Sequence, residues 1–542
     1  MQGVTPPATG EPDVSVIVAT YNGAAYVECA LDSLVRQTIG PERMQVLVVD
    51  DGSTDATPAI VDRYAAEHSC VEVIHQPNSG GPAQPRNRAL ESVRGRYVFF
   101  LDQDDSVADD ALECMVRTAD VNGTDVVVAR MKGVGGRNTP RVVFPRTVPR
   151  TDVFSSAAYW LLNPLKLFRM SMVRSLDLKF DTEMSWGEDQ PFVAPAYIKG
   201  NGISILADKD YVNWVYRADR SNITTSVVSL SARMPVVDHM LDYVAASVPP
   251  GKDRDRLMRR HFLVEVLTSA FEGYRTEQDP ALRHAAFERF RELAEAYYTE
   301  RIDADFPPNG RVLMRLLLDG RSDEFSEYLD LVKQAGRPGV LVEGKHVFLG
   351  LPWFRDPERG LADGLFDIAG SLRVECRTEP LVPDGSGAHF SARCRLGALT
   401  DRVTAVDLIA RSRACGTDRS FPLAHTVVLD EERPFVRVED TGAVGRLLPR
   451  LPAGTYELFL RVSAGPTWRE RRVCECAPPP AEARVIKSSL HFGLGRAATL
   501  VTTGPGNLSL SVVDVVARWR RRIRRARTLV GKAVGRGSGR TA

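Results

Sequence analysis

Acidic side chains with the spacing of a metal site occur in the first part of the chain. Asp102 and Asp104 form a D-x-D, and because side chains alternate along an extended segment, both carboxylates can point to the same side. Two such carboxylates suit a hard cation, Mn²⁺ or Mg²⁺, that would neutralise a departing diphosphate. A solvated acidic turn is the alternative interpretation of a D-x-D taken alone.

A second acidic pair, Glu188 and Asp189, follows roughly 80 residues later in the run Trp-Gly-Glu-Asp-Gln. A group transfer that inverts a carbon centre needs one base to take the proton from the acceptor hydroxyl, and a carboxylate suits this role. The alternative is a helix N-terminus that carries acids for electrostatic reasons.

Apolar, largely β-branched runs precede the first polar clusters and predict the strands that position them. The expected strands are Val14–Ala19, Val46–Val49 and Tyr97–Leu101, and they run into Thr20-Tyr-Asn-Gly, Asp50-Asp-Gly-Ser and Asp102-Gln-Asp-Asp. Helical patterns separate these strands, so a parallel sheet is expected. Ligands bind beyond the carboxyl ends of the strands in such sheets, and the polar clusters should therefore meet along one edge.

Four stretches carry a family resemblance through their order and spacing. They are V-S-V-I-V-A-T-Y-N from Val14, V-L-V-V-D-D-G-S-T-D from Val46, N-S-G-G-P-A-Q-P-R-N-R-A from Asn78 and F-L-D-Q-D-D from Phe100. Together they resemble the GT-A nucleotide-binding half of family 2 glycosyltransferases. The resemblance implies an α/β fold with a Rossmann-like, mostly parallel sheet and a UDP-sugar donor.

The resemblance also implies roles for individual residues. The expected nucleotide-sugar-binding residues are Ala19, Thr20, Tyr21, Asp51 (at the uracil), Asn78, Arg86, Asp102 (at ribose or sugar) and Gln103; Asp104 is the expected metal ligand, Asp189 the base, and Glu188 its assistant. Many relatives carry Pro where this chain has Ala19, whose backbone can still serve.

Two further arginines are candidates for the same site. Arg217 and Ser221 match the R-x-x-x-S loop of the wall teichoic acid glycosyltransferases that modify polyribitol phosphate, and a basic loop here could close over a diphosphate. An ordinary surface loop is the alternative. Arg130 follows an expected strand and could face the donor or the acceptor.

The chain is expected to divide into four parts. We predict a GT-A domain over 1–225, a helical linker over 226–335, an all-β immunoglobulin-like sandwich region over 336–511 and a basic amphipathic tail over 512–542. Helices are expected at 234–248, 253–274, 281–302 and 310–317. In the teichoic acid enzymes, sandwiches after a helical linker help to form oligomers or to hold polymer, so a homo-oligomer is an expected partner.

The charge of the chain is unevenly distributed. Net charge is +1, yet ten of the 70 Lys and Arg lie in 517–542 and all 69 acidic residues lie before it. Plotted at 100° per residue from Val512, the tail has an apolar face that includes Trp519, surrounded by arginines. Such a helix suits an anionic membrane surface, and a disordered tail or one bound to the acidic body is the alternative. Few aromatic residues accompany the charge, so no nucleic-acid partner is expected.

The preferred hypothesis is an inverting, metal-dependent transferase. It would move N-acetylglucosamine or another hexose from UDP to a hydroxyl of a cell-envelope polymer, such as teichoic acid or polysaccharide, or of a lipid-linked glycan. No signal peptide or membrane-spanning run is recognised, so a cytoplasmic enzyme peripherally associated with the inner face of the membrane is expected. The alternatives are an inactive glycan-binding scaffold and a polysaccharide chain-extending synthase.

Overall fold

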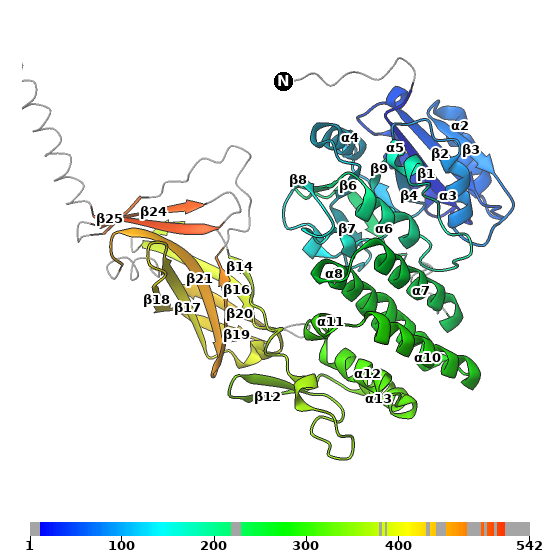
Figure 1. Cartoon of the computed structure of the whole chain (residues 1–542). Coiled ribbons are helices and arrows are strands. Elements are labelled where there is room, and N and C mark those ends of the chain that lie inside the picture. Colours follow the sequence, from blue (N-terminus) through cyan, green and yellow to red (C-terminus); the bar gives the residue numbers. More distant parts are fainter. Residues whose placement is uncertain are drawn as a thin grey trace, which may run out of the picture. The chain divides into compact units, whose positions relative to one another are not determined.

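The computed structural model describes residues 11–217, 229–378, 382–384, 387–429, 434–440, 451–473, 489–492, 496–502 and 507–514. These residues form two compact units (Figure 1). Unit 1 lies within Met1–Phe306 and Leu313–Lys333, and unit 2 lies within Pro307–Val312 and Gln334–Ala542.

An eight-stranded sheet is the framework of unit 1. Its strand order is β3-β2-β1-β4-β9-β6-β10-β8. The strands are β1 (Val14–Thr20), β2 (Met44–Asp50), β3 (Val71–His75), β4 (Tyr97–Asp102), β6 (Val126–Ala129), β8 (Val148–Thr151), β9 (Leu167–Arg169) and β10 (Ile203–Leu206). β1 pairs in parallel with both β2 and β4, and β2 with β3, whereas β9 is antiparallel to its neighbours. The expected mostly parallel α/β sheet is confirmed.

Helices cover this sheet because its central strands are apolar on both faces. They are α1 (Val27–Val35), α2 (Thr57–Glu67), α3 (Ala83–Leu90), α4 (Ala111–Asn122), α5 (Met170–Ser175) and α6 (Gln190–Lys199). A small second sheet has the order β5-β11-β7 and consists of β5 (Ser106–Val107), β7 (Met131–Val134) and β11 (Val212–Val215). In this small sheet, β5 begins just after the D-x-D, and β11 ends just before Arg217.

The second part of unit 1 is helical. It contains α7 (Leu230–Ser247), α8 (Lys252–His261), α9 (Phe271–Thr276), α10 (Pro280–Tyr297), α11 (Glu300–Ala304), α12 (Pro308–Leu318), which extends across the division between the units, and α13 (Ser322–Gln334). A π-helix, Phe262–Ala270, connects α8 to α9. The single helix expected over 281–302 is wrong, because the side chain of Thr299 accepts a hydrogen bond from the backbone N–H of Ile302 and starts α11.

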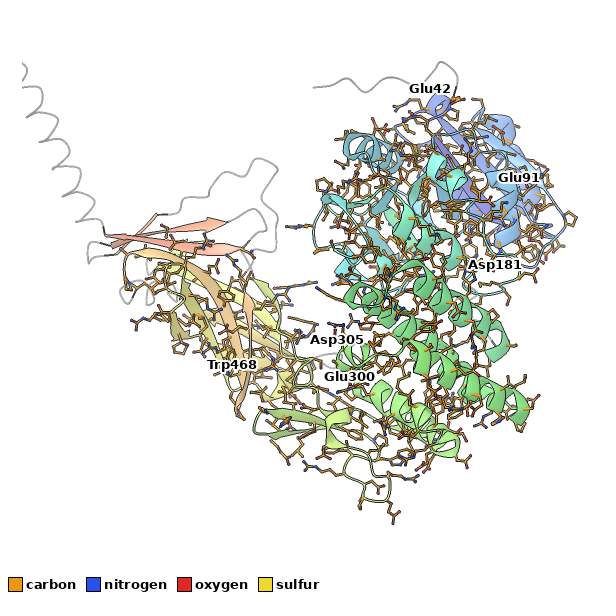
Figure 2. The ribbon with its side chains drawn as sticks, in the orientation of Figure 1. Glu42, Glu91, Asp181, Glu300, Asp305 and Trp468 are labelled. Carbon is orange, nitrogen blue, oxygen red and sulfur yellow. The ribbon has the colours of Figure 1, made fainter. Side chains whose placement is uncertain are left out.

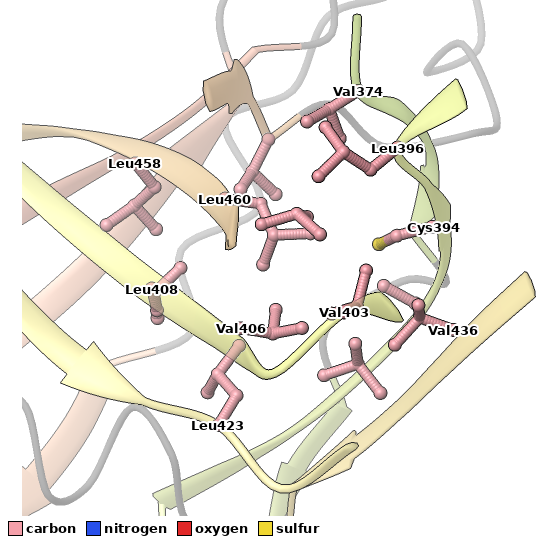
Figure 3. Packing of buried hydrophobic residues seen from close by; sticks show 14 of the residues in the cluster. Val374, Cys394, Leu396, Val403, Val406, Leu408, Leu423, Val436, Leu458 and Leu460 are labelled. Carbon is pink, nitrogen blue, oxygen red and sulfur yellow. The ribbon is translucent and has the colours of Figure 1, made fainter. Parts of the chain in front are cut away.

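Two antiparallel sheets share the hydrophobic core of unit 2 (Figure 3). One has the order β14-β16-β20-β19, with β15 beside β16, and the other has the order β18-β17-β21-β25-β24-β23, with β22 beside β21. The strands are β14 (Glu375–Thr378), β15 (Val382–Asp384), β16 (Gly387–Arg395), β17 (Ala405–Ser412), β18 (Asp418–Pro422), β19 (His425–Val428), β20 (Phe435–Asp440), β21 (Gly454–Ala464), β22 (Thr467–Arg472), β23 (Ser489–Phe492), β24 (Arg496–Thr502) and β25 (Leu508–Asp514). A hairpin of β12 (Gly339–Glu343) and β13 (His346–Gly350) precedes them.

Buried residues from both sheets make this core continuous. Cys394 of β16 and Val436 of β20 face Leu408 of β17 and Leu460 of β21 (Figure 3). Alternation of buried and exposed residues along β21 shows that one face of that sheet is covered. The expected all-β sandwich is confirmed.

The expected tail begins too early. Val512 pairs with Gly454 of β21 and Ala498 of β24, and it is buried, so the residues up to Asp514 belong to the sandwich. Residues 515–542, with Trp519 and the ten cations, lie outside the described residues. Among the helices of the described ranges, not one is sufficiently long and apolar to span a bilayer.

Candidate active site

A cavity of about 830 Å³ lies at the carboxyl ends of β1, β2 and β4. Its wall includes every residue named for the donor, the metal and the base, except Arg130 and Ser221. The sequence-predicted residues in the wall are Ala19, Thr20, Tyr21, Asp51, Asn78, Arg86, Asp102, Gln103, Asp104, Glu188, Asp189 and Arg217. The structure therefore brings the three polar strand ends together with the Glu-Asp pair.

Asp51 is held in a fixed orientation at the end of β2. Its Oδ1 accepts hydrogen bonds from Gln76 Nε2 (2.7 Å) and Ser79 Oγ (2.9 Å), and its backbone oxygen accepts one from Asn78 Nδ2 (3.0 Å). Gly52 allows this approach: its φ is +75°, and a Cβ there would lie 2.5 Å from the Asn78 nitrogen. Sequence reasoning missed Gln76 and Ser79, whose polar types just after β3 were the available signal.

Gln103 connects the ends of β1 and β4. Its Oε1 accepts from Thr20 Oγ1 (2.5 Å) and from the Tyr21 backbone N–H (3.0 Å), and its Nε2 donates to the Tyr21 oxygen (3.2 Å). Thr20 and Gln103 are both buried. These contacts fix the backbone after β1, the segment expected to contact the nucleotide.

Arg86 connects the strand ends on one side of the cavity to the Glu188–Asp189 pair on the other. From α3 it donates through Nη2 to Asp102 Oδ1 (2.7 Å) and through Nη1 to Glu188 Oε1 (2.9 Å). Its guanidinium lies 5.1 Å from the centre of the Phe180 ring and is almost completely buried. A planar guanidinium can hold two carboxylates at once, which a lysine cannot do with the same geometry.

Three carboxylates crowd the end of β4. Burial and the neighbouring Asp102 raise the pKa of Asp104, and burial together with both neighbours raises the pKa of Asp105. Arg217 Nε donates to Asp104 Oδ2 (2.8 Å). Asp105 Oδ1 accepts from the Val215 N–H, while its buried Oδ2 has no hydrogen-bond partner among the described residues.

This donor set fits a hard divalent cation. Carboxylate oxygens are the ligands that Mn²⁺ and Mg²⁺ prefer, and Mg²⁺ commonly takes one or two of them, with substrate phosphates and water completing the shell. Within the described ranges, no cluster of three or more His, Cys, Asp or Glu is arranged to hold a metal ion. A cation bound there would reduce the repulsion between the carboxylates of Asp102, Asp104 and Asp105.

Asp189 lies at the start of α6, deep in the cavity. Burial and the adjacent Glu188 raise its pKa to about 7, although Arg86, Lys166 and Arg260 oppose that rise. Gly187 lets the chain turn here: its φ is +77°, and a Cβ would lie 2.9 Å from Val236 Cγ2 of α7. A carboxylate with a pKa near neutrality is suited to general base catalysis.

The helical region contributes a buried polar network behind Asp189. Glu265 Oε1 accepts from Gln190 Nε2 (2.8 Å) and Arg260 Nη1 (2.5 Å), and Glu265 Oε2 lies 3.1 Å from His261 Nδ1. His261 Nε2 lies 2.9 Å from the hydroxyl of Tyr159. Arg260, Glu265 and Gln190 line the cavity, and none of them was assigned a role from the sequence.

Aromatic and basic side chains that sequence reasoning did not name as ligands complete the wall. Trp160, Trp186 and Trp214 all line the cavity. Arg137, also in the wall, stacks 3.6 Å from the centre of the Trp214 ring, and burial lowers its pKa. Trp186 opens the Trp-Gly-Glu-Asp-Gln run, whereas Arg137, Trp160 and Trp214 have no fixed spacing to the motifs, so no sequence signal pointed to those three.

Two predicted site residues are not in the cavity wall. Arg130 donates instead to Asp210 Oδ1 (2.8 Å) and to the Ala207 oxygen (2.7 Å), so its expected position facing the donor or acceptor is wrong. Arg130 directly follows the last pair of β6 with β10, and its side chain bonds to acceptors in the turn after β10. Ser221 lies outside the described residues.

Two family models match this chain. Residues 15–174 match "Glycosyl transferase family 2", and residues 233–329 match the glycosyl transferase TarS linker domain. The chain contains a family 2 glycosyltransferase domain. The first match includes the strand-end residues of the cavity wall, and the linker match includes Arg260 and Glu265, which also line the cavity.

Curated relatives agree with this assignment. The poly(ribitol-phosphate) beta-glucosyltransferase of Bacillus spizizenii is 30% identical over 315 residues, covering 57% of this chain and 49% of the relative. The poly(ribitol-phosphate) beta-N-acetylglucosaminyltransferase TarS of Staphylococcus aureus is 38% identical over 197 residues, 36% of this chain and 34% of TarS. The chain thus spans half the length or less of these two relatives.

Crystal structures of S. aureus TarS match as well. One covers 93% of this chain and 85% of that chain, with a TM-score of 0.60 and 23% identity, and it supports the fold alone. TarS 1–349 in complex with UDP-GlcNAc covers 63% of this chain and 98% of that chain, with a TM-score of 0.54 and 28% identity.

Proposed function

We propose that the chain is an inverting glycosyltransferase that moves a sugar, N-acetylglucosamine or another hexose, from UDP to a hydroxyl of poly(ribitol phosphate). One observation carries the proposal: Arg86 joins Asp102 of the D-x-D to Glu188, next to Asp189, in one cavity. The named substrates of the two relatives and the UDP-GlcNAc complex of TarS support the donor and the acceptor.

The proposed residues divide the reaction between the two halves of the cavity. Asp51, whose carboxylate is held by Gln76 and Ser79, contacts the nucleotide base, and Arg86 fixes Asp102 for the ribose or sugar. Asp189 takes the proton of the acceptor hydroxyl as that oxygen attacks the anomeric carbon and the bond to the diphosphate breaks. Glu188 assists by keeping the pKa of Asp189 high.

Asp104 is the proposed metal ligand, with Asp102 beside it. A Mn²⁺ or Mg²⁺ ion bound there would neutralise charge on the leaving diphosphate. Arg217, which donates to Asp104, is placed to contact the same diphosphate.

Membrane binding by residues 515–542 and self-association through unit 2 are further parts of the proposal. Residues 515–542 would bind anionic lipid through their ten cations, and the sandwich of unit 2 would associate with further copies. Removal of 515–542 should leave transfer to a soluble acceptor intact and weaken binding to anionic vesicles; unchanged vesicle binding would contradict the membrane role.

The direct test is UDP release from a panel of UDP-sugars with purified poly(ribitol phosphate), with and without Mn²⁺ or Mg²⁺. We expect release that depends on both acceptor and cation, and one preferred sugar. The same assay separates the alternatives, because an inactive scaffold releases no UDP and a chain-extending synthase lengthens its own sugar product instead of decorating the polyol phosphate.

A further inference from the structure

Two cysteines lie directly opposite each other on neighbouring strands of unit 2. Cys376 of β14 is opposite Cys394 of β16 in the antiparallel register, and their Sγ atoms are 3.4 Å apart. Opposite residues of an antiparallel pair have Cα atoms about 4.5–5.5 Å apart, within the range of about 4.4–6.8 Å that disulfides span. The two sulfurs therefore need to approach by only about 1.4 Å to reach the length of a disulfide bond.

The two thiols differ in exposure. Cys394 is buried in the core of the sandwich (Figure 3), whereas Cys376 is partly exposed. β14 is the end strand of the order β14-β16-β20-β19, and Cys376 packs against the rim of the core. A small thiol reagent can therefore approach Cys376 more easily than Cys394.

Hydrogen bonding and charge favour the thiolate of Cys376. The Cys394 thiol donates to Cys376 Sγ, which lowers the pKa of Cys376 although burial opposes this, and Arg471 lowers it further. Arg471 of β22 is anchored two residues away, because its Nη1 donates to the Val374 oxygen (3.1 Å). The same hydrogen bond and burial raise the pKa of Cys394. Since the thiolate is the nucleophile in thiol–disulfide exchange, Cys376 is the sulfur expected to attack.

A bond between these sulfurs would fasten a strand that has little else to hold its register. β14 is four residues long and pairs with β16 through four positions, of which Cys376 with Cys394 is the second. The next inward pair on the same two strands, Thr378 opposite Ala392, packs without sulfur. A covalent bond at an edge strand would restrict its opening, because an edge strand is paired on one side only.

We propose that Cys376 and Cys394 form a reversible disulfide that fastens β14 to β16, with a low-molecular-weight disulfide as the oxidant. The Cys376 thiolate attacks one sulfur of the oxidant, whose S–S bond breaks as one thiolate leaves. The sulfur of Cys394, on losing its proton, then attacks Cys376 and expels the second thiolate. Two protein thiols are oxidised, and the external disulfide is reduced to two thiols that take up the two protons. The site does not depend on the proposed function.

The test incubates the full-length protein in glutathione buffers of increasing oxidised fraction. Peptide mapping after alkylation of free thiols identifies the link, and hydrogen exchange followed by mass spectrometry measures the opening of β14. We expect a Cys376–Cys394 link that a reductant removes, and exchange of the β14 amides that the link slows about tenfold or more. C376S should exchange at the same rate in oxidised and reduced buffers. C415S, which removes an exposed cysteine outside the pair, should behave like the parent.

A third variant, C394A, tests the order of the two steps. Without the second thiol, a glutathione adduct should accumulate on Cys376, because nothing displaces it. The measurements on the parent and on C376S do not depend on the folding of C394A. An adduct on Cys394 in C376S would overturn the assignment of Cys376 as the attacking sulfur. The inference is overturned if both thiols of the parent stay free across the series, if Cys376 is linked to another cysteine, or if the link leaves exchange of β14 unchanged.

Discussion

Arg217 Nε donates a hydrogen bond to Asp104 Oδ2 at 2.8 Å. The carboxylate proposed to hold the metal is therefore already bound by an arginine. Arg217 also stacks 4.9 Å from the centre of the Tyr26 ring and is largely buried. An arginine and a divalent cation on the same carboxylate oxygen compete with each other. Metal binding at Asp104 should therefore be coupled to displacement of Arg217.

Substitution R217Q should strengthen Mn²⁺ binding. Loss of a charge-assisted hydrogen bond worth about 1.5–3 kcal/mol to the competing side chain predicts roughly ten- to hundredfold tighter Mn²⁺ binding, measured by electron paramagnetic resonance with UDP present. R130Q is the matched control, since Arg130 pairs with Asp210 outside the cavity wall and should leave Mn²⁺ affinity unchanged. Weaker Mn²⁺ binding by R217Q would show that Arg217 supports the cation instead of competing with it.

Substitution D189N should abolish transfer but not donor binding. A positioned general base contributes about 10²–10⁴-fold to rate, and an amide cannot accept the proton. UDP release measures the loss, and calorimetry with UDP-sugar measures the retained affinity. D181N, eight residues earlier and close to the surface (Figure 2), should behave like the parent. Transfer at the parental rate by D189N would place the base elsewhere.

The dependence of rate on pH should reflect the raised pKa of Asp189. A base with a pKa of about 7 is protonated, and inactive, below that pH, so kcat/KM should fall about tenfold per pH unit below 7 and level off above it. Because Glu188 raises the pKa of Asp189, E188Q should move the midpoint to lower pH. A midpoint that stays in place in E188Q would contradict the coupling.

The sequence predicted well which residues meet at the edge of the sheet, because these residues lie at strand ends. Asp102 follows an apolar run directly and Asp51 follows one after a single residue, and the pairing of β1 with both β2 and β4 then brings these strand ends together. The acceptor half depends on contacts between distant helices, such as Gln190 with Glu265, and no periodic pattern encodes them. For Arg130, the end of the strand was predicted correctly, but the side chain bonds to Asp210 outside the cavity wall.

Substitution of Arg86 should damage both halves of the cavity at once. R86M leaves Asp102 and Glu188 without their shared cation, and R86K offers a single ammonium where two hydrogen bonds of 2.7 and 2.9 Å are made. We expect about 2 kcal/mol lower unfolding free energy for R86M and loss of transfer in both variants. R88M, on the same helix but exposed, should change stability by less than about 0.5 kcal/mol. Full activity in R86K would refute a role for bidentate geometry.

Glu265 should be a major source of stability for the acceptor half. Burial by itself would raise its pKa, but Arg260, His261 and Gln190 outweigh that effect and lower it to about 2. E265Q leaves the buried Arg260 charge without a counter-ion, so the free energy of unfolding should fall by about 3–5 kcal/mol. Urea unfolding, followed by the fluorescence of the tryptophans that line the cavity, measures this loss. In the parent, the contribution of Glu265 to stability is complete above pH 4.5 and is lost as the pH falls toward 2. The free energies of unfolding of the parent and E265Q should therefore become similar at acidic pH. E292Q, exposed on α10 and paired with Arg289, should cost less than about 0.5 kcal/mol, and an equal loss in both variants would contradict the special position of Glu265.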